Sequence, residues 1–482
     1  MTKLALVLST LLTSAVAETI HGVVVFSRHG DRTTKHYKNQ QLTSLGAEQN
    51  FLQGSQFRSR YLDADSSLQI LGVSEDKYVS AQVAASAPDQ AILLNTATAF
   101  LQGLYPPLEG LDPDLAANQL NNGSDSVSPL NGYQYVVLHG QSADAPDAIW
   151  IKGDDSCPSA ITAQNSFMKS DEFAQRSEET KSFYEKFQDT LKDVYDYSTP
   201  ANFSYKNAYD IFDLVNVARI HNASSPSLDV SDEDLFQLRT LADSAEFGTN
   251  FNASQPDRDI HARTLNAGLL AQLQQIVTTK AKLKFSLFAG SYDTMLAFFG
   301  VNGLTELSDD FKGLPDYAST LSFELFTEND VTGFPDSTDD LRVRFFLKNG
   351  TTGAFTSYPL FGTGEDSLSW SDFESSMTER SLSEVGEWCT TCNSELPFCA
   401  AYVDSKASGS NDGKDSDDKG GMSGLTKAGI AMLVIGCVFL VAGLALFLMS
   451  RKKRAQGPVA VAGAPITSDQ KSINSASTPS QV

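Results

Sequence analysis

The chain has 482 residues, of which 41% are hydrophobic and 10% aromatic, and its formal net charge at pH 7 is −23. This length and apolar content suffice for one large folded core or two smaller ones. The negative charge argues against nucleic acid as a partner, because a phosphate backbone would be repelled, and it disfavours adsorption of the folded part to anionic lipid.

The first 17 residues are predicted to be a secretory signal peptide. Lys3 precedes an apolar run from Leu4 to Leu12, and Ala15-Val16-Ala17 supplies the small residues of a cleavage site before Glu18. A buried first helix is the weaker interpretation, because the run is short and stands at the extreme terminus. We therefore expect the mature chain to begin at Glu18 and to be exported.

Residues 23–32, with the sequence Val-Val-Val-Phe-Ser-Arg-His-Gly-Asp-Arg, join an apolar run to a cationic cluster. The run predicts a buried strand, central in a parallel sheet, and ligands bind at the carboxyl ends of such strands. Arg28 and Arg32 suit phosphate oxygens, since a guanidinium donates two hydrogen bonds at once. Gly30 lets the backbone approach a ligand, and His29 is a candidate nucleophile. A lone Arg or His at a strand end is more often a surface residue, but the complete pattern is not expected by chance.

The segment Ser27-Arg28-His29-Gly30-Asp31-Arg32 resembles the signature of the histidine acid phosphatases, in the phosphoglycerate-mutase-like superfamily. The resemblance implies an α/β fold with a phosphoglycerate-mutase-like sheet core, helices on both faces and a mainly helical insertion, which we place at about residues 107–260. Leu42-Thr43-x-x-Gly46 is similar to the family's start of the next helix. The family usually has proline two residues after the second arginine, where this chain has Thr33-Thr34.

Apolar spacing along the rest of the exported chain agrees with an α/β core. Between Phe167 and Tyr195 the aromatic residues recur at spacings that fit one helix face, and core packing explains them better than a cofactor site. The predicted helices cover 42–61, 91–101, most of 160–220, a segment starting at 231, and 263–280. The predicted strands cover 283–288, 321–326 and 343–347, the last forming a hairpin with 355–360.

Asp293 is the candidate proton donor, because phosphoryl transfer needs a proton for the leaving oxygen as well as a nucleophile. It follows the predicted strand 283–288 and precedes an apolar helical run. The family carries a His-Asp pair in this context, and here Tyr292 stands in place of the histidine. The resemblance implies that Asp293 is the acid and that the residue at 292 helps to hold phosphate. An Asp at a helix N-terminus is also a common cap, and that alternative stays open.

The family's third phosphate-binding arginine has no counterpart here. No arginine occurs between Arg60 and Arg176, and Gln90, before the helix that ends in Phe100-Leu101-Gln102-Gly103, is the nearest polar substitute. Loss of one charge-assisted contact costs ~1.5–3 kcal/mol, which is about one to two decades in rate or affinity. We therefore expect turnover at this site to be slower than in family members that have the third arginine.

Four exported cysteines predict two disulfides, for which three connectivities are possible. A metal or redox role for the Cys-x-x-Cys pair is disfavoured, since the sequence shows neither a second such pair nor a nearby histidine. These cysteines are Cys157, Cys389, Cys392 and Cys399. Asn-x-Ser/Thr sequons predict glycosylation. They begin at Asn122, Asn202, Asn222, Asn252 and Asn349.

The C-terminal part predicts membrane anchoring. Residues 404–427 have the polar composition of a flexible stalk, and 428–449 form an uncharged apolar stretch long enough to span a bilayer. Arg451-Lys452-Lys453-Arg454 follows at once, which places the tail 450–482 in the cytosol and residues 18–403 on the exported side. The expected topology is a single-pass type I protein of the cell surface or vacuole.

Taken together, these features predict an acid phosphatase that hydrolyses small phosphomonoesters through a phosphohistidine, without metal or cofactor. Phytate is disfavoured as substrate, because an acidic protein with few pocket cations suits six phosphates poorly. Tyr292 and the missing arginine keep a second hypothesis open, a weak or inactive phosphatase-like surface glycoprotein. A mutase of the same superfamily is the least favoured, since sugar-phosphate mutases have little to do outside the cell.

Overall fold

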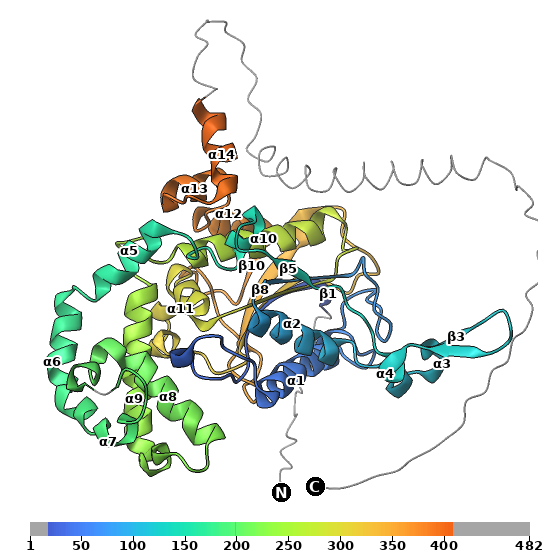
Figure 1. The fold of residues 1–482 in the computed structure, drawn as a ribbon. Helices are drawn as coiled ribbons and strands as arrows, with labels where there is room; N and C mark the ends of the chain where they lie inside the picture. Colours follow the sequence, from blue (N-terminus) through green and yellow to red (C-terminus); the bar gives the residue numbers. More distant parts are fainter. Residues whose placement is uncertain (1–17, 198, 408–482) are drawn as a thin grey trace, which may run out of the picture. The chain divides into compact units, whose positions relative to one another are not determined.

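The computed structural model describes residues 18–197 and 199–407 (Figure 1). The predicted signal peptide, the transmembrane segment 428–449, the tail 450–482 and all of the predicted stalk after Ala407 lie outside the described residues. Within the described ranges, every helix is too short or too polar to cross a membrane.

One large mixed sheet forms the centre of the molecule, with strand order β10-β8-β7-β1-β6-β2-β5 and β9 paired to β8. β1, β6, β2 and β5 run parallel to one another, whereas β7, β8, β9 and β10 add antiparallel pairings. Their bounds are β1 Thr19–Arg28, β2 Val83–Pro88, β5 His139–Gln141, β6 Phe285–Gly290, β7 Thr320–Thr327, β8 Arg342–Lys348, β9 Thr356–Ser357 and β10 Ser367–Ser369.

β1 is central and entirely buried, as predicted, because its alternate side chains enter two different cores. Val24 and Phe26 belong to a core that also contains side chains of α10 (Ile260–Thr278), α11 (Tyr292–Val301) and α12 (Trp370–Glu379). Val23 and Val25 pack on the other face against α1 (Ser44–Tyr61) and α2 (Ala91–Leu104). The prediction of an α/β core with helices on both faces is confirmed. The prediction that β1 is central in a parallel sheet is wrong on one side, where its neighbour β7 runs antiparallel to it.

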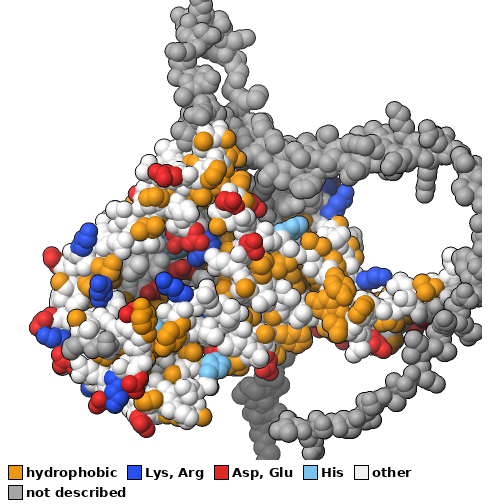
Figure 2. Space-filling view, in the orientation of Figure 1, with side chains coloured by type: hydrophobic (Ala, Val, Ile, Leu, Met, Phe, Trp, Pro, Cys, Tyr) orange, Lys and Arg blue, Asp and Glu red, His pale blue; other side chains and the backbone are white. Residues whose placement is uncertain are grey.

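The segment predicted as a mainly helical insertion, about 107–260, contains three different parts. An arm projects to the right in Figure 1 and carries η2 (Leu108–Gly110), α3 (Pro113–Ala116), α4 (Pro129–Gly132) and the hairpin of β3 (Ala117–Gln119) and β4 (Asp125–Val127). Figure 2 shows hydrophobic side chains gathered on this arm, and its exposed residues include Leu120, Leu130 and Tyr135. β5 then joins the main sheet, so this part of the segment belongs to the core.

The remaining part is a helical cap with a small core of its own. The aromatic run predicted on one helix face is instead divided, because Ser170 caps a new helix by accepting from the Phe173 amide, and Tyr195 is exposed. The helices of the cap are α5 Pro158–Phe167, α6 Asp171–Glu185, α7 Gln188–Leu191, α8 Ala208–His221 and α9 Asp232–Asn250.

One disulfide ties the C-terminal helix α13 (Val385–Cys392) to the body of the protein, and a second ties α14 (Pro397–Ala407) to α13. Cys157 is bonded to Cys392 across 235 positions, and Cys389 is bonded to Cys399. The Trp388 indole donates to the Gly153 carbonyl at 2.8 Å beside the first bond. All five sequon asparagines are exposed or half-exposed.

Candidate active site

Three neighbouring parallel strands end at one edge of the sheet, and each is followed by a predicted site residue. His29 follows β1, Tyr292 and Asp293 open α11 after β6, and Gln90 follows β2. The register pairs Arg28 with Gly290, and the His29 amide donates to the Gly290 carbonyl at 3.2 Å. The sheet therefore brings together segments that are about 60 and 260 positions from the signature.

His29 is a buried, neutral imidazole. It is 2% exposed, and its Nδ1 lies 2.8 Å from the Gly30 carbonyl oxygen. A carbonyl can only accept, so Nδ1 carries the proton and Nε2 keeps its lone pair. Burial and then the charges of Arg28 and Arg32 lower the pKa of His29 well below its ordinary value. The nucleophilic form therefore persists at acid pH.

Gly30 has a different role from the one predicted. A Cβ atom at this position would lie 2.3 Å from the carbonyl oxygen of Gly46, in the first turn of α1. The Gly30 amide also donates to the Asn50 side chain at 2.7 Å. The close approach that requires glycine is therefore between the signature loop and α1, which fixes the loop on the sheet edge.

Arg28 is held by uncharged groups. Its Nη1 donates to the Pro315 carbonyl, and its guanidinium lies over the rings of Tyr317 and Tyr292, 4.6 and 5.1 Å from the centroids. Its buried Nε has no hydrogen-bond partner in the described part of the chain. Burial lowers the pKa of Arg28 from its usual value, but an arginine stays charged at any physiological pH. Arg28 is thus a cation available to an anionic ligand.

Arg32 is mostly committed to a carboxylate of the helical cap. Both of its Nη atoms bond to Asp213 on α8, at 3.0 and 3.1 Å, and they also donate to the Thr33 carbonyl at 2.9 Å and the Tyr209 hydroxyl at 2.7 Å. Four of its five N–H donors are used in this way, and the buried Nε is left without a partner among the described residues. Arg32 can therefore offer a phosphate one hydrogen bond.

Tyr292 does not present its proton to a phosphate. Its hydroxyl donates to Glu246 of α9 at 2.8 Å and accepts from Lys35 Nζ at 3.0 Å. Burial and the Glu246 charge raise the pKa of Tyr292 well above its usual value, so the hydroxyl stays protonated. The free N–H donors next to Tyr292 are therefore those of Lys35.

Asp293 lies between two lysines. Its Oδ2 is 3.6 Å from Lys152 Nζ, and its Oδ1 accepts from the Thr294 amide at 3.0 Å. Burial alone would raise its pKa, but the charges of Lys152 and Lys35 outweigh burial and hold the pKa of Asp293 below its ordinary value. Ser291, not Asp293, occupies the N-cap of α11. Asp293 is therefore ionised at acid pH in the free protein, and it is not the helix cap.

Gln90 reaches the same edge but makes no hydrogen bond that replaces an arginine. It caps α2 without a side-chain bond, and it lines a small cavity of about 40 Å³ together with Lys152. The positive charge on this side of the site thus comes from Lys152, in the loop between η3 (Pro146–Trp150) and α5.

Sequence reasoning missed four charged residues of this site. Lys35 stands three positions after the signature, where its proximity was a usable signal. Lys152, Asp213 and Glu246 come from loops and helices far away in the chain, and no local pattern distinguishes them from surface charges.

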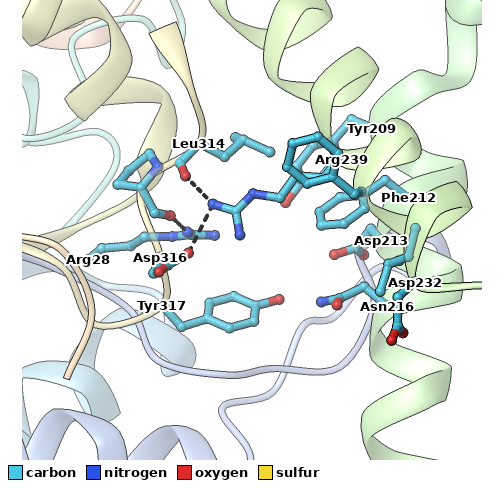
Figure 3. A pocket seen from close by; sticks show the side chains of 13 residues that line it. Arg28, Tyr209, Phe212, Asp213, Asn216, Asp232, Arg239, Leu314, Asp316 and Tyr317 are labelled. Atoms are coloured by element: carbon cyan, nitrogen blue, oxygen red, sulfur yellow. Dashed lines mark hydrogen bonds and ion pairs between the residues drawn. The ribbon is translucent and has the colours of Figure 1, made fainter. Parts of the chain in front are cut away.

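A cavity of about 280 Å³ opens beside Arg28 (Figure 3). Arg28 and Tyr317 lie on one side of it, and Phe212 and Asp213 of α8 lie on the other. Neither His29 nor Asp293 lines this cavity, although the Tyr317 ring is 5.8 Å from the His29 ring. The cavity therefore adjoins the sheet-edge site without containing it.

Comparison with known proteins gives a family model and a set of similar structures. The model described as histidine phosphatase superfamily (branch 2) matches residues 36–348. A phytase from Klebsiella sp. ASR1 is 12% identical with a TM-score of 0.50, and the match covers 76% of this chain and 96% of that one. The phytase of Citrobacter braakii is 15% identical with a TM-score of 0.49, covering 76% and 99%. The phytase of D. castellii is 13% identical with a TM-score of 0.49, covering 85% and 90%. No curated protein matches the chain in sequence.

Proposed function

Because the chain belongs to the histidine phosphatase superfamily (branch 2), we propose that it hydrolyses phosphomonoesters at acid pH through a phosphohistidine on His29. The observation that carries this proposal is the neutral, buried His29 imidazole flanked by Arg28 and Arg32, each with a buried Nε that has no partner among the described residues. A neutral imidazole whose Nε2 keeps its lone pair, beside two cations, suits attack on a phosphoryl group.

In the first step, Nε2 of His29 attacks phosphorus and the bond from phosphorus to the leaving oxygen breaks. Arg28, the Nε of Arg32 and the ammonium groups of Lys35 and Lys152 balance the charge of the transferred group. The Asp293 carboxyl gives its proton to the leaving oxygen, so the products are an alcohol and a phosphohistidine. In the second step water attacks phosphorus, the bond from phosphorus to Nε2 breaks and Asp293 accepts the proton of the water, so that phosphate and free His29 result.

Asp293 must be protonated for the first step, although the two lysines favour its ionised form in the free protein. A bound phosphate places negative charge beside Lys35 and Lys152 and so offsets their effect on Asp293. Substrate binding therefore raises the pKa of Asp293 and prepares it to act as the acid. This coupling explains how one carboxyl can serve a site so rich in positive charge.

The decisive experiment is to trap the intermediate. Full-length protein is mixed with a radiolabelled aryl phosphate at acid pH and quenched in alkali, where phosphohistidine survives. Label on His29, absent from His29→Ala, is expected. If His29→Ala kept full turnover, the mechanism would be wrong.

A second function, a phosphatase-like protein that binds ligand without turnover, is favoured by the Arg32–Asp213 pair and by the Tyr292 hydrogen bond to Glu246. Both interactions use hydrogen-bond donors that would otherwise be available to a phosphate. Calorimetry with inorganic phosphate, run beside the trapping experiment, separates the two functions: binding without label favours this second one.

We also propose that the folded part lies on the exported side of a membrane, anchored by the predicted segment 428–449. The two disulfides and the surface position of all five sequons support export. Deglycosylation should increase the gel mobility of the cell-derived protein. Protease added outside sealed vesicles should spare residues 18–407 when the exported side faces the vesicle interior, and should cleave them when the exported side faces outward.

A further inference from the structure

The walls of the 280 Å³ cavity beside Arg28 point to a type of substrate. We propose that this cavity receives the leaving group of a monophosphate ester with an aromatic ring, and that polyphosphorylated polyols are poor substrates. This inference rests on the proposed phosphatase function and names the substrate class for the same site.

Rings and aliphatic side chains form most of the cavity wall. Tyr317 and Tyr209 stand near the arginines of the signature, and Phe212 of α8 lies across the cavity (Figure 3). Phe236 of α9 also lines it. Flat apolar side chains favour a flat apolar ligand, because stacked and edge-on ring contacts add to simple burial. A polyol exposes hydroxyl groups on every side and gains little from such a wall.

Charge limits the cavity to one phosphate. Arg28 has no carboxylate among the groups that perturb its pKa, and it makes no ion pair within the described ranges. Each carboxylate of the wall is paired with an arginine, and the charges of each pair cancel. Apart from Arg28, the wall therefore has no net positive charge that could hold a second phosphate. The pairs are Asp213 with Arg32 at 3.0 Å, Asp232 with Arg219 at 2.7 Å, and Asp316 with Arg239 at 2.9 Å.

Position and size agree with a leaving-group pocket. Tyr317 contacts both the Arg28 guanidinium and the His29 ring, so a phosphate at His29 can place its ester group past Tyr317 into the cavity. The volume of about 280 Å³ lies just below the ~300–1,000 Å³ typical of ligand pockets. A single ring fits that space better than a large ligand.

The test compares substrates whose leaving groups have similar basicity, so that intrinsic reactivity does not decide the result. The full-length protein is assayed with 2-phenylethyl phosphate, ethyl phosphate and inositol hexakisphosphate. We expect kcat/KM for the phenylethyl ester to exceed that for the ethyl ester by about tenfold or more, and the hexakisphosphate to be the poorest substrate.

Phe236→Ala is the matched variant, because Phe236 is 70% exposed and its loss leaves the fold intact. It should lower the ratio of kcat/KM for the phenylethyl ester to kcat/KM for the ethyl ester about threefold. Tyr135→Ala, on the distant arm, is the control and should leave kcat/KM for both alkyl esters unchanged. Equal rates for the two alkyl esters, or a preference for the hexakisphosphate, would overturn the inference.

Failure of this inference is distinguishable from failure of the phosphatase function. Turnover that depends on His29 but ignores the ring refutes the aromatic pocket alone. If no ester is turned over, calorimetry with phenylphosphonate and methylphosphonate still decides: tighter binding of the phenyl compound, reduced in Phe236→Ala, supports the pocket, and equal or absent binding refutes it.

Discussion

Arg32 and Asp213, 181 positions apart in the chain, form a buried pair in which both guanidinium Nη atoms meet the carboxylate at 3.0 and 3.1 Å. The pair joins the signature loop to α8 of the helical cap. Asp213 also accepts from the Thr34 hydroxyl and from the Lys35 amide. Two histidine pairs, His36 with Asp210 at 2.8 Å and His221 with Asp31 at 2.5 Å, hold the same loop against the same helix.

Asp213→Asn should destabilise the protein by roughly 3–5 kcal/mol, because it leaves the Arg32 charge buried without a counter-charge. Urea unfolding followed by tryptophan fluorescence measures this. Asp232→Asn is the matched control, since Asp232 pairs with Arg219 at 2.7 Å but is 94% exposed, and it should cost ~0–1 kcal/mol. Equal effects of the two substitutions would show that burial does not strengthen the first pair.

Lys35→Met should lower kcat/KM about ten- to a hundredfold, because it removes a charge-assisted contact to the phosphoryl group. It should also move the alkaline limb of the kcat/KM profile to higher pH, since Lys35 lowers the pKa of Asp293 in the free enzyme. Lys38→Met removes the same charge from an exposed position of the same loop and serves as the control. An unchanged pH profile in Lys35→Met would contradict the coupling.

Asp293→Asn should slow alkyl phosphates by about 10²–10⁴-fold, the range typical of a lost general acid. A nitrophenyl ester should lose much less, because its leaving group departs as a stable anion and needs no proton. The measurement is the rate loss caused by Asp293→Asn on the alkyl phosphate divided by the rate loss on the nitrophenyl ester. A uniform loss on both esters would assign Asp293 a role in binding or structure and not in proton transfer.

Asp259→Asn should stabilise the protein increasingly as the pH rises above about 4. Asp259 is 4% exposed, its Oδ1 has no hydrogen-bond partner in residues 18–197 and 199–407, and burial raises its pKa from 3.8 to about 7. A raised acid pKa means that the folded state binds the proton more tightly, so stability is lost as pH rises from about 4 to 7. Asparagine removes that loss.

The Asp259→Asn variant should therefore equal the wild type below about pH 4 and exceed it by roughly 2–4 kcal/mol near pH 8. Thermal unfolding across this range measures the difference. The exposed Asp366 provides the control substitution Asp366→Asn, for which the difference should stay near zero at every pH. A pH-independent gain in Asp259→Asn would mean that packing, not ionisation, is responsible.

Local sequence determined the framework of this protein. The apolar run before Arg28 became the central strand β1, and the helix at 42–61 and the hairpin of β8 with β9 formed as predicted. Such elements follow from periodicity and turn chemistry within a few residues. The family signature is equally local, so the proposed nucleophile His29 and its two neighbouring arginines could be identified from one segment.

Tertiary structure alone decided how those residues are used. Asp213 bonds to both Nη atoms of Arg32, Glu246 accepts the hydrogen bond of the Tyr292 hydroxyl, and Lys152 holds Asp293 ionised. The charge state of a buried group depends on burial and on neighbours within a few ångströms, and these neighbours come from distant parts of the chain. A one-dimensional pattern names the ionisable groups, but only the fold places the charges that act on them.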